Sequence, residues 1–202
     1  MGNEASCTVR LGNQRSQGKA LLETKELIFR GDFRLKIPFS AMKSVGAAKG
    51  ELRVQGPDGE AIFELGETAA KWREKILHPK SRIEKLGVKR DARVSLLGEF
   101  QEEFRSELRE RTRNVSHQAI TSDAEWIFFA AGSKKELANV AKHAKKMRGS
   151  MGLWVVYPKG QKAITELDVL AMGRKSGLKD VKVVGFSPKH TALKFVIPLA
   201  AR

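Results

Sequence analysis

A short apolar strand, a sharp turn and an amphipathic helix follow one another in the middle of the sequence. The strand is Arg93–Leu97, the turn holds Gly98 and Glu99, and the helical pattern covers Phe100–Arg113. Where such a turn holds a phosphate, several glycines let backbone N–H groups approach the anion at the start of the helix. Gly98 is the only glycine in this turn, so the turn lacks the other glycines of an anion-binding loop.

Carboxylates gather at the same turn. Glu99, Glu102 and Glu103 lie where they stabilise the helix dipole and repel a phosphate or a carboxylate. The sequence therefore argues against a dinucleotide at this position. Asp123 could meet the hydroxyls of a ribose, but an Asp in a turn usually caps its own backbone, and we expect that role here.

Two further segments are expected at the same edge of the sheet. Ala131–Ser133 follows the apolar run Glu125–Ala130, and Tyr157–Gly160 ends the strand Leu153–Tyr157. Ligands of open αβ sheets bind beyond the C-terminal ends of the strands. The candidate ligand edge therefore consists of Gly98, Glu99, Gly132, Ser133, Tyr157 and Lys159. The alternative for the last two is structural: Pro158 ends the strand and Tyr157 packs with its hydroxyl at the surface.

One expected helix, Ser133–Arg148, concentrates positive charge. Ser133 and Glu136 have the spacing of a capping box, and the apolar positions from Leu137 to Met147 mark a buried stripe. The candidate polyanion-binding residues are Lys134, Lys135, Lys142, Lys145, Lys146 and Arg148. Such a helix could neutralise phosphates, and a solvated helix face is the alternative. No recognised nucleic-acid motif and no aromatic residue accompanies it.

Metal and disulfide chemistry have no support in the sequence. His117, His143 and His190 belong to different expected elements, and Cys7 is the single cysteine. Neither a metal-ligand set nor an internal disulfide is expected, and no catalytic residue is assigned.

The elements from Arg93 to Ile197 follow the order strand, helix, strand, strand, helix, strand, helix and hairpin. Glu125–Ala130 is almost entirely apolar, which predicts a central strand covered on both faces. Thr165–Ser176 is the last expected helix. The closing strands pair across Ser187–His190.

The first 80 residues have a different pattern. Seven short segments with β-like alternation are separated by turn residues, and a helix with Trp72 on its apolar face ends before Pro79. This pattern resembles a pleckstrin-homology or GRAM-type barrel over residues 6–78, in which the helix closes one end. The resemblance implies an anion-binding loop, here Gly12–Gly18. One Arg and the following Lys19 make a weak headgroup site, so we favour a scaffold or docking barrel.

The C-terminal half resembles class I S-adenosylmethionine-dependent methyltransferases in its later strands and closing hairpin. Its front part departs from them, because only 26 residues separate Gly98 from Glu125, and a single βαβ unit takes about 30. At least one strand–helix repeat is therefore expected to be absent.

A second resemblance spans roughly residues 82–198. It rests on Lys85–Val88, Ala124–Ile127, Leu153–Lys159 and Ala192–Phe195, and it points to a small bacterial family catalogued only as domain of unknown function three thousand and fifty-two. His190 and Thr191 stand where that family usually has a Trp-Ser pair. The resemblance implies a bacterial origin and a Rossmann-like fold, and no chemistry.

Charge and composition support two domains. Residues 1–80 carry 14 Lys and Arg against 10 Asp and Glu, whereas residues 81–202 carry 24 against 13. The net charge of +15 favours a polyanion or an acidic protein as partner. No apolar run reaches the ~20 residues that span a bilayer, and the single cysteine predicts a cytoplasmic protein.

We therefore predict an α+β and α/β chain. A seven-stranded PH-like barrel with a closing helix occupies 1–80, and a shortened Rossmann-like, methyltransferase-like sheet ending in an antiparallel hairpin occupies 81–202. The missing glycine loop and missing repeat favour a non-catalytic binding or docking module without a cofactor. The alternatives are a divergent S-adenosylmethionine-dependent methyltransferase, using Gly98 and Tyr157–Gly160, and a basic nucleic-acid-associated protein.

Overall fold

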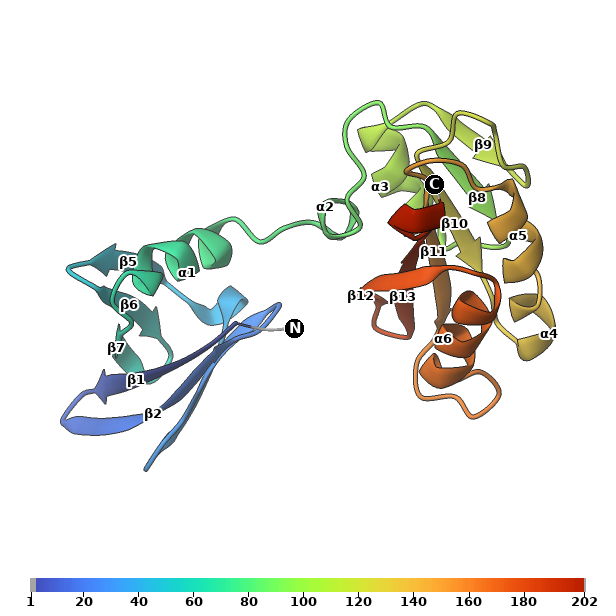
Figure 1. Cartoon of the computed structure of the whole chain (residues 1–202). Helices are drawn as coiled ribbons and strands as arrows, with labels where there is room; N and C mark the ends of the chain where they lie inside the picture. Colours follow the sequence, from blue (N-terminus) through green and yellow to red (C-terminus); the bar gives the residue numbers. More distant parts are fainter. Residues whose placement is uncertain (1–2, 202) are drawn as a thin grey trace. The chain divides into compact units, whose positions relative to one another are not determined.

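The computed structural model describes residues 3–201. The chain divides between Lys80 and Ser81 into two compact units (Figure 1). Within the described residues, no helix is long and apolar enough to cross a membrane.

The N-terminal unit is a curled antiparallel sheet of seven strands in the order β4-β3-β2-β1-β7-β6-β5 (Figure 1). The strands are β1 (Asn3–Leu11), β2 (Gln14–Leu22), β3 (Glu26–Arg30), β4 (Arg34–Pro38), β5 (Ser44–Ala48), β6 (Glu51–Gly56) and β7 (Gly59–Glu64). A short 3₁₀ turn, Phe39–Ala41, joins β4 to β5. The predicted antiparallel architecture is confirmed.

The helix α1 (Thr68–Leu77) covers one end of this sheet and contacts β5 and β6. Its inward face carries Ala69, Trp72 and Ile76, all buried. Trp72 packs in one apolar cluster with Phe29 and Phe63, which are fully buried on the strands. The change from a two-residue to a 3.6-residue period after Gly66 therefore located this helix correctly.

The loop expected at Gly12–Gly18 is shorter in the structure. The turn between β1 and β2 consists of Gly12 and Asn13, and the residues from Gln14 onward belong to β2. Arg15 forms an ion pair with Glu64 at 3.8 Å. The polar run Gln14–Gln17 has no apolar alternation, so the sequence pattern does not predict its strand conformation.

The C-terminal unit is a six-stranded mixed sheet in the order β12-β13-β11-β10-β8-β9 (Figure 1). Its strands are β8 (Val94–Leu97), β9 (Val115–His117), β10 (Trp126–Ala130), β11 (Gly152–Pro158), β12 (Lys179–Ser187) and β13 (His190–Val196). The pairs β8–β9, β8–β10 and β10–β11 are parallel, and β13 pairs antiparallel with both β11 and β12. The Rossmann-like sheet with a closing hairpin is confirmed.

Helices cover both faces of this sheet. On one face α2 (Arg82–Lys85) and α3 (Glu102–Arg111) contribute Ile83, Phe104 and Leu108 to a cluster that includes Phe128 and Trp154. The other face holds Ile127 and Val155 and is covered by α4 (Lys134–Leu137), α5 (Val140–Lys146) and α6 (Glu166–Lys175). Because successive side chains of a strand point to opposite faces, an unbroken apolar run such as β10 fills both clusters.

Two local expectations for this unit need correction. The single helix predicted over Ser133–Arg148 is interrupted at Ala138 and Asn139, which separate α4 from α5. The predicted capping box is half formed: the Ser133 hydroxyl accepts a hydrogen bond from the Glu136 N–H, but the Glu136 carboxylate accepts one from the Gly132 N–H at 2.6 Å. Glu136 is thereby turned toward the strand end.

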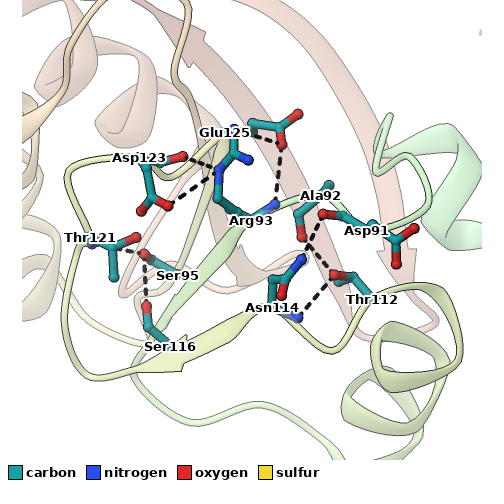
Figure 2. Close-up of polar contacts among 10 residues, drawn as sticks. All are labelled: Asp91, Ala92, Arg93, Ser95, Thr112, Asn114, Ser116, Thr121, Asp123 and Glu125. Atoms are coloured by element: carbon teal, nitrogen blue, oxygen red, sulfur yellow. Dashed lines mark hydrogen bonds and ion pairs between the residues drawn. The ribbon is translucent and has the colours of Figure 1, made fainter.

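A polar network anchors the connection between β8 and β10 (Figure 2). The Ser95 side chain on β8 is fully buried, and its hydroxyl accepts hydrogen bonds from the Ser116 hydroxyl at 2.9 Å and from the Thr121 N–H at 3.3 Å. The Arg93 guanidinium donates to the Asp123 carbonyl at 2.8 Å and forms an ion pair with Glu125 at 3.5 Å. The segment between β9 and β10 is thus tied directly to β8.

The same network fixes the preceding turn (Figure 2). Thr112, at the end of α3, donates its buried hydroxyl to the Ala92 carbonyl at 2.7 Å and accepts a hydrogen bond from the Asn114 N–H. The Asn114 amide reaches the Asp91 carbonyl at 2.9 Å. Both ends of the short β8–α3–β9 unit are therefore held by side-chain hydrogen bonds.

Replacing Ser95 by alanine should destabilise the C-terminal unit. The change leaves the half-buried Thr121 N–H without its acceptor, which costs about 1–3 kcal/mol. Urea denaturation followed by circular dichroism measures the loss. Ser106→Ala is the control, because Ser106 is exposed on α3, and it should change the unfolding free energy by less than about 0.5 kcal/mol. Equal effects of both changes would contradict the anchoring role of Ser95.

Candidate functional site

The turn after β8 is shaped by a close contact with β10. Gly98 has φ +88°, and a Cβ atom there would lie 3.0 Å from the Ala130 carbonyl oxygen and 3.3 Å from the Ala130 Cβ. Only glycine fits both the dihedral angle and the space. The Gly98 N–H points toward the Gln118 side-chain oxygen at 3.4 Å. The ends of β8 and β10 therefore lie so close together that there is no room for a side chain at position 98.

A cleft of about 580 Å³ opens at this edge. The chain leaves β8 toward β9 on one side and resumes at β10 on the other, so the cleft lies at a switch point in the strand order. Apolar side chains of Leu97, Phe100, Phe129, Val156 and Phe186 line it. The polar groups around it come from Glu99, Gln101, Gln118, Glu136, Asn139, His143 and His190.

The charge of this lining is opposite to that of the protein. Across the part of the chain that the structure describes, no Lys or Arg lines the cleft, although the chain carries 38 of them and a net charge of +15. Glu99 is 91% exposed and pairs with Arg105 at 3.3 Å, and Glu136 is held by the Gly132 N–H. The lining therefore contains two carboxylates and, among the described residues, no Lys or Arg, while Arg105 pairs with Glu99 from outside the lining.

His143 brings a buried imidazole to the lining. Its ring packs edge-to-face on Phe129, with ring centroids 4.6 Å apart, and its Nε2 atom is buried without a hydrogen-bond partner. Burial, and then the nearby Lys146 and Lys142, lower the pKa of His143. The ring is thus held neutral near pH 7, the form in which one of its nitrogens accepts a proton or a hydrogen bond.

The second imidazole of the lining is anchored through a hydrogen bond. His190 begins β13, and its Nδ1 atom lies 3.0 Å from the Ser187 hydroxyl across the closing turn. His190 and Gln118 reach the cleft from opposite sides, because β13 and β9 lie on opposite sides of the β10–β8 pair in the sheet, and Gln118 directly follows β9.

The structure separates the six candidate edge residues into three groups. Gly98, Glu99 and Gly132 line the cleft, whereas the Ser133 hydroxyl caps α4. Tyr157 and Lys159 line a second hollow, of about 410 Å³, which adjoins the first at Pro158.

Tyr157 differs from its expected environment. Its ring is buried, and its hydroxyl donates to the Glu166 carboxylate at 3.1 Å instead of standing free at the surface. Burial and the Glu166 carboxylate raise the pKa of the Tyr157 phenol far above its ordinary value. The hydrogen bond from Tyr157 to Glu166 links the end of β11 to the start of α6, so the role of this side chain is structural.

The cations of the basic helix also fall into groups. Lys134 pairs with Asp168 of α6 at 3.0 Å, and the Arg148 guanidinium donates to the Lys145 and Met147 carbonyls. The remaining four lysines are exposed, and among the described residues they form no ion pair or side-chain hydrogen bond: Lys135, Lys142, Lys145 and Lys146.

Of the polar side chains in the lining, only Glu99 is among the residues predicted from the sequence for the ligand edge. Gln118, Asn139, His143 and His190 come from three separate places in the chain, and only the fold brings them together. The one available signal was the i, i+4 spacing of positions 139 and 143, which places both side chains on the same face of a helix.

Comparisons with known proteins give folds and no family. No family model matches the chain, and no curated protein sequence matches it. The similarity of residues 82–198 to the family of unknown function therefore remains a prediction.

Several solved structures resemble the chain. A putative type 11 methyltransferase from Sulfolobus solfataricus is 11% identical, with 53% of this chain and 84% of that chain covered and a TM-score of 0.42. A TehB-like SAM-dependent methyltransferase from Corynebacterium glutamicum is 10% identical, with 64% and 96% covered and a TM-score of 0.39. One from Aquifex aeolicus is 15% identical, with 61% and 96% covered and a TM-score of 0.39. Likeness at this level carries no argument about activity, and the fold rests on the strand order of the chain itself.

The lowered pKa of His143 predicts a specific pH dependence of stability. A base whose pKa is lower in the folded than in the unfolded state binds fewer protons when folded, so stability is lost as pH falls below the ordinary value of 6.5. His143→Leu should remove this contribution, so the difference in Tm between the variant and the parent protein should move in favour of the variant from pH 7.5 to 5.5.

Scanning calorimetry at the two pH values measures that shift. His117→Leu is the matched control, because His117 is exposed on β9. A shift of the same size in the control, or a shift against the His143 variant at low pH, would contradict a buried neutral imidazole.

Proposed function

We propose that the C-terminal unit binds a nucleoside-sized ligand of neutral or positive net charge in the cleft between Gly98, Gly132 and His190. S-adenosylmethionine is the ligand of this class that we favour. The observation that carries the proposal is a lining with two carboxylates and, among the described residues, no Lys or Arg, in a chain of net charge +15.

Size and position support a small-molecule site. A cleft of about 580 Å³ falls within the range of roughly 300–1,000 Å³ that is typical of ligand pockets. It lies beyond the C-terminal ends of parallel strands at a switch point, where open αβ sheets bind ligands. Its apolar floor and few convergent polar groups have the composition of such pockets.

Charge then selects among ligands of that size. A pyrophosphate would meet Glu99 and a turn with a single glycine, in place of the cations and backbone N–H groups that phosphates require. S-adenosylmethionine carries a sulfonium and an ammonium against one carboxylate, so carboxylates favour it. Gln118 and Asn139 offer amides for its hydroxyl and ring nitrogen groups, and Phe100 and Phe186 offer apolar surface for a planar base.

Two candidate functions share this binding step. Methyl transfer would use a base for the acceptor proton, and His143 and His190 are the imidazoles at the cleft. A non-catalytic binding module is favoured by the 26-residue connection between Gly98 and Glu125, which leaves out a strand–helix repeat. The two functions differ in turnover and not in the ligand.

Isothermal titration calorimetry with the whole chain tests the binding step. We expect S-adenosylmethionine to bind with a lower Kd than S-adenosylhomocysteine, which lacks the sulfonium charge and is net neutral, and NAD to show no binding. Glu99→Gln should raise the Kd of S-adenosylmethionine roughly two- to fivefold, the effect of one exposed charge, and should leave the Kd of adenosine unchanged.

Glu103→Gln is the matched control. It makes the same charge change in the first turn of α3 but lies outside the cleft lining. An equal effect of both variants on the Kd would assign the preference to net charge alone. Tighter binding of NAD than of S-adenosylmethionine would refute the proposed ligand class.

A further inference from the structure

The chain has a long segment in which positive charge is not balanced. Between Glu136 and Glu166 the sequence has 29 residues without an Asp or Glu, and six of them are Lys or Arg. On α3 of the same unit, by contrast, Arg105 pairs with Glu99 and Arg109 with Glu102. The segment contributes six of the eleven excess positive charges of this unit.

Four of these six cations lie on α5 or directly after it. Lys142, Lys145 and Lys146 are exposed, while Val140 and Met147 of the same segment are buried against the sheet. The helical spacing 142, 145, 146 places the three lysines on one side of the helix. Together with the exposed Lys135 and Arg148 they form what we call the basic surface.

The far end of α5 is arranged to keep a cation in place. Arg148 lies beyond the last turn, and its guanidinium donates to the Lys145 and Met147 carbonyls at 2.8 and 2.7 Å. These carbonyls lie at the negative end of the helix, where a positive charge is stabilised. The cation at this position is therefore less mobile than a free lysine side chain.

Spacing and composition indicate the partner. Lys142 to Lys146 extend along about 6 Å of helix at 1.5 Å per residue, and a nucleic-acid duplex carries about one phosphate charge per 1.7 Å. None of the large apolar side chains found exposed in the described residues lies within residues 134–148. Anchors for a membrane are thus missing from it, and the absence of aromatic residues there removes stacking on unpaired bases.

We propose that the basic surface, formed by Lys135, Lys142, Lys145, Lys146 and Arg148, binds the phosphate backbone of double-stranded nucleic acid without reading its sequence. The binding is independent of the ligand proposed for the cleft. Backbone contacts of this kind give Kd values of about 10⁻⁴ to 10⁻⁶ M at physiological salt.

Fluorescence anisotropy of a labelled 20-base-pair DNA duplex, titrated with the whole chain across a salt series, tests the surface. The variant Lys142→Gln, Lys145→Gln, Lys146→Gln should reduce the slope of log K against log salt by about 2.7, since each phosphate contact contributes about 0.9. A second duplex of unrelated sequence should bind the parent protein with the same Kd.

The control variant removes three charges from elsewhere in the unit. Lys89, Lys179 and Lys189 are exposed, and their replacement by glutamine should lower the slope by less than one contact. Equal losses in the two variants, or an unchanged slope in the α5 variant, would overturn the proposal. Tighter binding of the parent protein to phosphatidylserine vesicles than to duplex would also overturn it.

Two measurements keep folding and the cleft separate from this result. Both triple variants should unfold within a few degrees of the parent protein, because exposed substitutions cost little. Both should retain the parent Kd for S-adenosylmethionine. Loss of duplex binding with intact ligand binding in the α5 variant supports the basic surface, whatever the outcome of the cleft titration in the parent protein.

Discussion

The close approach of β8 and β10 is the constraint on which the C-terminal unit depends. The two strands pair in parallel, with Leu97 opposite Phe129, and their ends converge until a Cβ on Gly98 would lie 3.0 Å from the Ala130 carbonyl oxygen. Leu97 and Phe129 then form part of the apolar lining of the cleft. The ends must stay this close for the turn to face Gly132, and the buried Ser95 network keeps β8 in register with the connection that leads to β10.

Charge is distributed in two opposite ways around that framework. The cleft holds Glu99 and Glu136 with no described Lys or Arg in its lining, while the outer face of α5 holds lysines with no acid near them in sequence. The same helix takes part in both, because His143 lines the cleft and Lys142 and Lys146 face outward. The neutral state of His143 is a consequence of this double role, since burial and the two lysines both disfavour its charged form.

The sequence predicted those elements whose pattern reflects burial. The apolar run 126–130 is β10, which is covered on both faces, and the amphipathic helix with Trp72 is α1. Two elements were not predicted correctly. The strand conformation of Gln14–Gln17 gives no apolar alternation, and the break between α4 and α5 at Ala138 and Asn139 falls inside a continuous helical pattern. Of the site, Gly98, Glu99 and Gly132 could be predicted from strand ends. Gln118, Asn139 and His190 could not, because tertiary folding alone assembles them.

Amide hydrogen exchange of the whole chain, with and without saturating S-adenosylmethionine, tests most directly that the cleft binds this ligand. If the cleft binds S-adenosylmethionine, amide exchange should slow in peptides that cover residues 97–101, 131–136 and 139–143, with no change in the N-terminal unit. Unchanged exchange throughout the chain, or protection confined to peptides outside the cleft, would contradict binding in the cleft.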